Sequence, residues 1–347
     1  MKASRVLVTG HNGYIGSIVA PFLAARGHEV VGLDTDFYVS CTLGPAPRAI
    51  PNLRKDIRDV TPDDLRGFDA VVHLAALSND PIGEINPDLT YEINHRGSVR
   101  LAEAAKQAGV RRFLFSSSCS MYGAAGEGLV GEEAPLRPLT PYAISKVRTE
   151  SDLGEMADDR FSPVFLRNAT VYGMSPRLRA DLVVNNLLCW AFTTGKIRIL
   201  SDGTPWRPVV HVEDVAQAFA LALESPTDSV HNVAFNVGSE EENYQVRDLA
   251  SFVHEAVPDC GVEYAEGGGP DPRSYQVDFG KIGKILPGFH RKRSVRDGVT
   301  DLLGVFRRNG MTLEDFQEKF TRLAHLRNLI ETKRLNGSFR WNEEARA

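Results

Sequence analysis

The chain has 347 residues, of which 42% are hydrophobic and 24% are charged, the ordinary composition of a globular protein. With 45 acidic against 40 basic side chains its net charge is −5, which disfavours nucleic-acid binding because such proteins usually carry a basic excess. It contains no apolar run of the ~20 residues that would cross a membrane, and its first strand begins too early to leave room for a signal peptide. The cysteines Cys41, Cys119, Cys189 and Cys260 are spaced too widely for a zinc site or a disulfide framework, so we expect a cytoplasmic protein without a metal.

Strand-like and helix-like segments alternate through the first half of the chain. Apolar runs predict strands over residues 5–10, 29–34, 69–76, 111–118 and 161–173. Helical spacing predicts helices over residues 14–27, 94–109 and 141–157. This alternation is typical of right-handed βαβ units, and the continuous apolar strands indicate burial on both faces. The expected fold class is therefore α/β, with a Rossmann-type doubly wound parallel sheet.

The second half has a more mixed pattern. Helices are expected over 183–195 and 214–226, a strand over 235–239, and a charged amphipathic surface helix over 313–334. We therefore expect a dinucleotide-binding domain over 1–170, to which 208–240 returns. Residues 171–207 and 241–347 would form a smaller, mixed substrate-binding lobe with the C-terminal helices.

Three glycines, Gly10, Gly13 and Gly16, lie between the first strand and the first helix in "VLVTGHNGYIGSIVA". This pattern is typical of a dinucleotide-binding turn, in which glycines allow a tight bend, close approach of the pyrophosphate and close packing of the helix. Asp34 ends the next strand, 24 residues after Gly10, where an acid binds the adenosine ribose. A carboxylate there favours NAD, because it would repel the 2′-phosphate of NADP.

Tyr142 and Lys146 lie four residues apart in "PYAISK" and therefore share one face of the predicted helix. A neighbouring ammonium lowers the pKa of a phenol, so this pair can move a proton from a hydroxyl while hydride leaves its carbon. The serines 116–118 end the preceding strand at the carboxyl edge of the sheet, where one hydroxyl can hydrogen-bond the reacting oxygen.

Several ordered motifs together resemble a known family. They are "VTGHNGYIG", "VVHLAA", "YEINHRGSVRLAEAA", "FSSSCSMYG", "PYAISK", "LRNATVYG" and "DGTPWRPVVHVEDVAQA". Over residues 5 to about 280 the chain resembles the extended short-chain dehydrogenase/reductases, in particular the NAD-dependent nucleotide-sugar epimerases and dehydratases.

The resemblance implies roles for particular side chains. Tyr142 would be the catalytic acid/base, Lys146 its pKa partner and a nicotinamide-ribose contact, and Ser118 the group that bonds the sugar oxygen. Further cofactor contacts would come from the glycine turn, the adenine pocket, the strand ends and a supporting asparagine: Asn12, Tyr14, Ile15, Asp56, Ile57, Leu74, Ala75, Ala76, Asn94, Ser116 and Ser117. The nucleotide diphosphate of the substrate would contact Asn186 or Asn185, Arg207 and Arg273, because guanidinium groups suit oxyanions.

The chain departs from the family at positions that bear on the reaction. In 4,6-dehydratases an Asp-Glu pair follows the serine, whereas Cys119 and Ser120 stand here, which disfavours dehydration because neither replaces a carboxylic acid. Cys119 would serve as a second acid/base only if its thiol were exposed and had a lowered pKa. The alternative is that Cys119 is a small packed residue with a structural role.

The predicted sugar pocket also differs from the family pattern. Asn168, Ala169 and Thr170 replace the usual Tyr-Phe-Asn, and Pro208 replaces an aspartate. Ser78, Asn79 and Asp80 follow the cofactor-lining strand, where they either reach the hexose or cap a loop.

The leading hypothesis is an epimerase that oxidises a nucleotide-diphosphate sugar transiently with retained NAD and returns hydride to the opposite face. The alternatives are a 4-ketoreductase or other oxidoreductase acting on a nucleotide sugar and, more remotely, a non-catalytic NAD-binding regulator. The resemblance also implies a homodimer, formed through the helices over 94–109 and 141–157.

Overall fold

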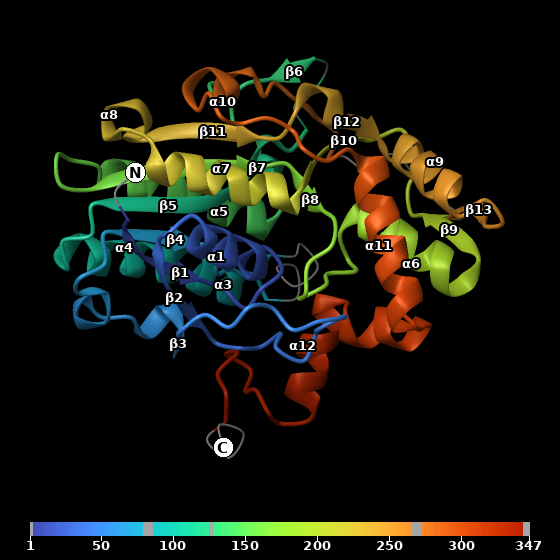
Figure 1. Ribbon diagram of the computed structural model, residues 1–347, viewed down its shortest axis with the longest axis horizontal. Coiled ribbons are helices and arrows are strands. Elements are labelled where there is room, and N and C mark those ends of the chain that lie inside the picture. Colours follow the sequence, from blue (N-terminus) through green and yellow to red (C-terminus); the bar gives the residue numbers. More distant parts are fainter. Residues whose placement is uncertain (1–2, 79–85, 125, 127, 266–272, 343–347) are drawn as a thin grey trace.

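A seven-stranded sheet forms the centre of the molecule (Figure 1). The computed structural model describes residues 3–78, 86–124, 126, 128–265 and 273–342. Every strand pairs in parallel with its neighbours, in the order β11-β7-β5-β4-β1-β2-β3. The bounds are β1 Arg5–Thr9, β2 Glu29–Asp34, β3 Asn52–Arg54, β4 Ala70–His73, β5 Arg112–Ser118, β7 Ser162–Asn168 and β11 Val233–Val237. The chain moves outward from β1 to β3 and then returns to β4, so the strand order reverses between β1 and β4.

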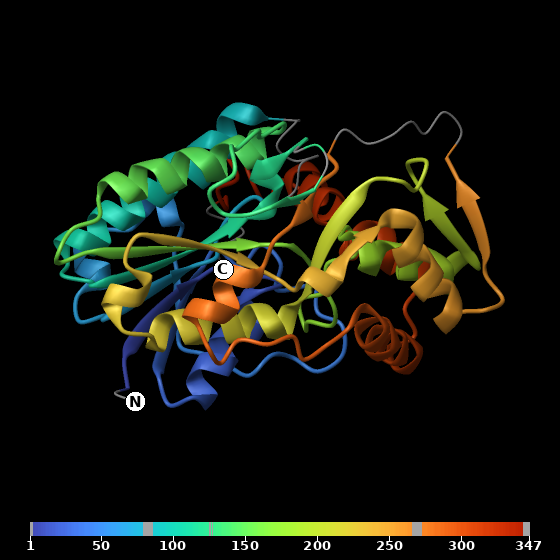
Figure 2. The same ribbon diagram turned by 90° about the horizontal axis from the view of Figure 1, so that it is seen from above.

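Helices cover both faces of this sheet, which Figure 2 shows edge-on between two helical layers. On one face, Val6 and Val8 of β1 pack with Val19 of α1 (Gly16–Ala25) and Phe219 of α7 (Val212–Glu224). On the other face, Leu7 packs with side chains of α4 (Ser98–Gln107) and α5 (Pro141–Glu155). Alternate residues of a strand point to opposite faces, so burial on both sides requires the apolar runs seen in the sequence. The predicted doubly wound α/β fold is confirmed.

A smaller lobe packs beside the carboxyl ends of the strands. Its core combines α6 (Val183–Thr194), α9 (Val246–Ala256) and α11 (Val295–Asn309) with β9 (Lys196–Ile199). The exposed strand β13 (Gly261–Tyr264) pairs in parallel with β9. A three-stranded sheet links it to the large domain through β8 (Thr170–Tyr172), β10 (Trp206–His211) and β12 (Asn243–Gln245).

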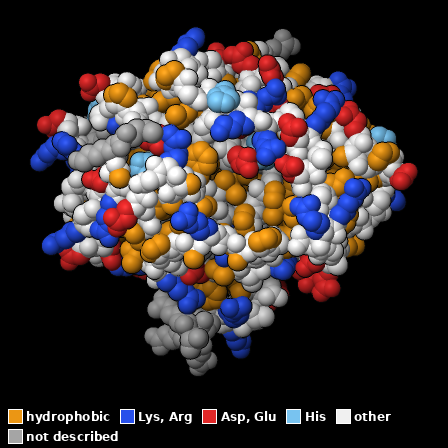
Figure 3. All heavy atoms as spheres, viewed as in Figure 1, with side chains coloured by type: hydrophobic (Ala, Val, Ile, Leu, Met, Phe, Trp, Pro, Cys, Tyr) orange, Lys and Arg blue, Asp and Glu red, His pale blue; other side chains and the backbone are white. Residues whose placement is uncertain are grey.

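Short elements complete the described chain. They are α3 Pro87–Thr90, α8 Thr227–Val230, α10 Gly280–Ile285, α12 Arg322–Glu331, β6 Leu129–Val130, β14 Gln276–Val277, 3₁₀ turns at Ile57–Asp59, Pro62–Leu65, Cys119–Tyr122 and Glu240–Glu242, and π-helical turns at Tyr91–Gly97 and Asp315–Lys319. None of the helices in the described ranges is long and apolar enough to span a bilayer. Acidic and basic side chains are interspersed over the face shown in Figure 3.

The structure corrects two predicted elements. The strand expected over 161–173 is two strands, because the Ala169 N–H bonds to the Val237 carbonyl and β8 then turns to pair with β10. The surface helix expected over 313–334 is broken into a π-helical turn and α12, and its inner face is buried whereas residues such as Arg327 stay exposed. Phe320 lies in the core of the small lobe, whereas Leu326 and Leu329 of α12 pack into the core of the large domain.

Candidate active site

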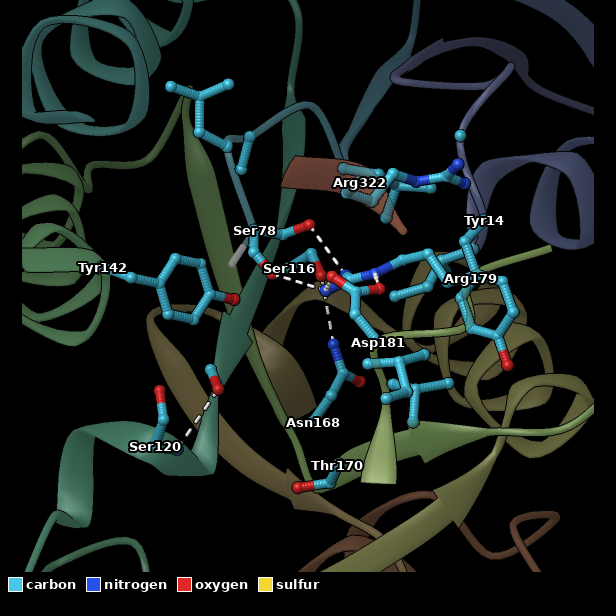
Figure 4. A pocket seen from close by; sticks show the side chains of 18 of the residues that line it. Tyr14, Ser78, Ser116, Ser120, Tyr142, Asn168, Thr170, Arg179, Asp181 and Arg322 are labelled. Atoms are coloured by element: carbon cyan, nitrogen blue, oxygen red, sulfur yellow. Dashed lines mark hydrogen bonds and ion pairs between the residues drawn. The ribbon is translucent and has the colours of Figure 1, made fainter. Parts of the chain in front are cut away.

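A cavity of about 810 Å³ lies where the carboxyl ends of the central strands face the small lobe. Its walls come from the turn after β1, the ends of β2, β4, β5 and β7, the start of α5, and α6 and α12. The position next to the reversal of strand order between β1 and β4 is where open α/β sheets bind ligands. Figure 4 shows the side chains that point into it.

The turn after β1 has room only for glycine at two positions. Gly10 has φ +72°, and a Cβ there would lie 2.7 Å from the Ala75 nitrogen. A Cβ on Gly16 would lie 2.1 Å from the Gly10 carbonyl oxygen, where the turn enters α1. Gly10 and Gly16 line the cavity where the turn enters α1, and the N-terminus of a helix suits a pyrophosphate group. Gly13 and Ile15 also line the cavity.

Asp34 ends β2 at the rim of the same cavity. Its carboxylate accepts hydrogen bonds from the backbone N–H groups of Asn12, at 2.9 Å, and Asp36, at 2.8 Å. Burial nevertheless raises the pKa of this carboxyl to about 6. The site therefore holds a nearly buried hydrogen-bond acceptor where the ribose hydroxyls of a dinucleotide would lie, and the glycine turn and Asp34 together fit such a cofactor.

Other predicted cofactor contacts divide into two groups. Asp56, Ile57, Leu74, Ala75 and Ala76 line the cavity. The other three make hydrogen bonds to neighbouring residues: the Asn12 amide bonds to Asp36, the Tyr14 hydroxyl donates to the Gly173 carbonyl, and Asn94 bonds both the N–H and the carbonyl of Leu77. Tyr14 still contributes part of the wall, whereas Asn12 and Asn94 hold loops in place.

Tyr142 and Lys146 enter the cavity from the first turns of α5. Thr140 caps this helix by accepting the Ala143 N–H, and Pro141 occupies its first turn. The Lys146 ammonium donates to the Ser116 carbonyl at 2.7 Å and lies 5.6 Å from the centre of the Tyr142 ring. Burial lowers the pKa of Lys146 to about 7.

The serines that end β5 lie opposite this pair. Ser116, Ser117 and Ser118 line the cavity, and the Ser118 hydroxyl accepts the Ser120 N–H at 3.2 Å. The Ser120 hydroxyl is buried without a hydrogen-bond partner and belongs to the cavity wall. Ser120 therefore offers a donor and acceptor without a partner on the side of the cavity where Tyr142 lies (Figure 4).

Cys119 does not meet the condition for catalysis. It is fully buried, its thiol faces the Arg167 carbonyl at 3.1 Å, and it is absent from the cavity wall. Burial raises the pKa of the thiol, which keeps it protonated. Cys119 is therefore a packed structural residue behind the end of β5.

Asn168 and Thr170 line the cavity, as Figure 4 shows. The Asn168 amide donates to the Ser116 hydroxyl at 3.0 Å, and its carbonyl oxygen is buried without a partner. An unpartnered buried acceptor is costly, so this oxygen is available to a ligand donor.

Of the residues predicted to contact the substrate, some line the cavity and others do not. Asn186, Arg207, Arg273 and Ser78 line the cavity, and Arg207 donates to the Arg273 carbonyl. Asn185 is buried behind it, where it bonds the Gly173 N–H at 3.1 Å. Asn79 and Asp80 lie outside the described residues.

Sequence reasoning missed five charged residues in the wall: Arg179, Asp181, Lys55, Arg198 and Arg322. Arg179 pairs with Asp181 and donates to the Ser78 hydroxyl at 2.9 Å. The segment "PRLRAD" was a signal for the first two, because it places arginines directly after a strand end. No local pattern pointed to Arg322.

A parallel sheet with a glycine turn, an acid at the end of the next strand and a Tyr-Lys pair at the same cavity is typical of dinucleotide-dependent enzymes with a Rossmann-type fold. Residues 6–238 match the NAD dependent epimerase/dehydratase family. The chain belongs to this family, and its cofactor is NAD.

Individual relatives act by more than one reaction. The chain is 31% identical to the UDP-glucose 4-epimerase of Streptomyces lividans over 273 residues, which are 72% of this chain and 80% of that protein. The UDP-glucose 4-epimerase of Thermotoga maritima, solved with UDP-glucose, is 28% identical with a TM-score of 0.76, covering 88% of this chain and all of that one (100%). DesIV, a dTDP-glucose 4,6-dehydratase of Streptomyces venezuelae solved with NAD, is 26% identical with a TM-score of 0.77, covering 88% and 97%.

Proposed function

We propose that this protein is an NAD-dependent epimerase of a nucleotide-diphosphate sugar. The observation that carries the proposal is that Tyr142 and Lys146 line the same cavity as the glycine turn, where Tyr142 would serve as the proton-transfer group. Its neighbours there are the hydroxyls of Ser118 and Ser120 and the amide of Asn168, which bind and orient oxygens but do not supply a strong acid. Such a site supports removal and return of hydrogen at a carbinol carbon.

The protein's own groups would handle the proton and the oxygen. Bound NAD supplies a nicotinamide ring that accepts a hydride from the sugar carbon and gives it back. Tyr142 takes the proton of the hydroxyl on that carbon and later returns it, while Ser118 bonds the same oxygen. Lys146 favours the phenolate form of Tyr142 when its amine is protonated.

Epimerisation requires the keto sugar to turn over between the two hydride steps, whereas the nucleotide stays anchored. Arg207, Arg273 and Asn186 lie on the small-lobe side of the cavity and would hold the diphosphate. Asn168 and Ser120 have open hydrogen-bonding atoms that can serve either orientation of the sugar.

Dehydration of the sugar would need a further acid at the leaving hydroxyl. The carboxylates in the described cavity wall are Asp34, Asp56 and Asp181. Asp181 is paired with Arg179, Asp56 with Arg58, and Asp34 lies beside the glycine turn. Their placement supports epimerisation over elimination.

The test is incubation of the purified protein with UDP-glucose and UDP-glucuronic acid in turn, without added cofactor. We expect an isomer of unchanged mass, abolished by Tyr142→Phe and retained by Tyr91→Phe, which alters a tyrosine outside the cavity wall. A product that is lighter by two hydrogens, formed only with added NAD and with release of NADH, would identify an oxidoreductase that performs net redox chemistry on the sugar. A product lighter by one water would identify a dehydratase.

A further inference from the structure

The C-terminal helix α12 inserts a cationic side chain into the cofactor cavity. Arg322 is 3% exposed and forms part of the cavity wall. In Figure 4 it lies on the same side as Tyr14 and Arg179, and Tyr142 lies on the other. Residue 322 is far beyond the segment 6–238 that matches the family.

The guanidinium of Arg322 is held in place by neighbouring groups, but one of its nitrogens has no hydrogen-bond acceptor. Its Nη2 donates to the Arg177 carbonyl at 2.9 Å, and its central carbon lies 4.1 Å from the centre of the Tyr38 ring. Its Nη1 is buried without a hydrogen-bond partner. Within the described ranges no carboxylate forms an ion pair with it, and Asp181 forms an ion pair with Arg179.

Burying a guanidinium with an unpaired N–H donor costs folding free energy unless an anion accepts a hydrogen bond from it. Burial and the nearby Arg179 lower the pKa of Arg322, in agreement with this cost. Two anions would enter this cavity, the diphosphate of the cofactor and that of the substrate, and both have the chemistry that a guanidinium fork binds.

The surroundings of Arg322 favour the cofactor. Tyr38 follows Asp34 by four residues in the loop after β2, and Tyr14 belongs to the glycine turn. Arg207 and Arg273, by contrast, lie together at β10, where Arg207 donates to the Arg273 carbonyl. We propose that Arg322 binds the diphosphate of NAD, so that the C-terminal segment completes the cofactor site on the side of the glycine turn.

The segment around Arg322 is fixed to the loops that surround the adenosine end. His325 and the Phe37 carbonyl are 2.9 Å apart, and Arg58 donates to the Ser338 carbonyl at 3.0 Å. Trp341 donates to the Thr35 carbonyl. These bonds place Arg322 before any ligand arrives, and pre-organised groups bind with less loss of entropy.

The test compares Arg322→Met with Arg327→Met, which removes an exposed arginine from the same helix. Binding of NAD and of UDP to NAD-free protein is measured by calorimetry at two salt concentrations. We expect Arg322→Met to weaken NAD about 10- to 100-fold, as for loss of a charge-assisted hydrogen bond, and to reduce the salt dependence of NAD binding. UDP binding should be unchanged, and Arg327→Met should bind both ligands as the wild type does.

Two results would overturn the proposal. One is unchanged NAD affinity in Arg322→Met, and the other is weakened UDP binding with intact NAD binding, which would assign the group to the substrate. Arg322→Lys keeps the charge and most of the packing, so it tests the same point if the methionine variant does not fold. We expect it to weaken NAD about tenfold, because an ammonium lacks the planar fork, and wild-type affinity there would also refute the assignment. This test does not depend on which sugar reaction the enzyme performs.

Discussion

Lys146 connects the stability of the protein to its chemistry, and its replacement by methionine gives a quantitative prediction. The side chain is 3% exposed, and its ammonium has the Ser116 carbonyl as a partner and the Phe115 ring centre at 4.5 Å. Burial lowers its pKa from 10.5 to about 7 in the cofactor-free protein. Methionine has a similar length and no charge, so the variant removes the titration with little change of volume.

The sign of the effect follows from linkage. Between about pH 7 and pH 10 the unfolded chain binds a proton at this lysine that the folded protein does not bind. The free energy of unfolding therefore rises with pH over this window, at up to about 1.4 kcal/mol per pH unit. With a folded pKa of about 7, the contribution of Lys146 grows by about 2 kcal/mol between pH 7 and pH 9.

The assay is urea unfolding of NAD-free wild type and Lys146→Met at pH 7, 8 and 9. The wild type should gain about 2 kcal/mol relative to the variant across this range. Lys284→Met, at an exposed lysine, should show no such difference from the wild type. A difference between wild type and Lys146→Met that stays constant with pH would refute the reasoning, because Lys146 would then keep its proton in the folded state throughout.

Three further variants test other parts of the site. Gly16→Ala places a Cβ 2.1 Å from the Gly10 carbonyl oxygen and should weaken NAD about tenfold or more in calorimetry, whereas Gly261→Ala, which meets nothing within 4 Å, should not. Cys119→Ala should keep activity within about tenfold in a product assay, since the thiol is buried away from the cavity; a loss far beyond that would restore it as a catalytic candidate. Asp34 has a pKa of about 6, so NAD affinity should fall about tenfold from pH 7 to pH 5 as its carboxylate is protonated, and Asp34→Asn should remove this dependence.

Local chemistry made much of the fold and site predictable. The glycine turn, Asp34 and the Tyr142–Lys146 pair are short-range patterns, because each depends on one turn or one helix face. The strands of the central sheet were also predictable, because strands that are buried on both faces are continuous apolar runs.

The predictions failed at residues whose position depends on contacts with segments distant in the sequence. Cys119 and Asn185 have residue types and positions typical of a site, but tertiary contacts bury both behind the cavity wall. The segment 313–334 has an amphipathic pattern that fits a surface helix. Its apolar residues instead divide between two cores, which breaks the helix and carries Arg322 inward. The spacing of the apolar residues in the sequence does not show which of the two cores each of them joins.

The central claim is that hydrogen leaves and returns to the same sugar carbon without exchange with water. The most direct measurement is turnover of an accepted nucleotide sugar in D₂O, followed by mass spectrometry and NMR of the product. The account predicts an epimer with no deuterium bound to carbon, because the hydrogen is carried as hydride and Tyr142 exchanges only a hydroxyl proton. Deuterium on a ring carbon, or a product lighter by one water, would show proton abstraction from carbon and would contradict it.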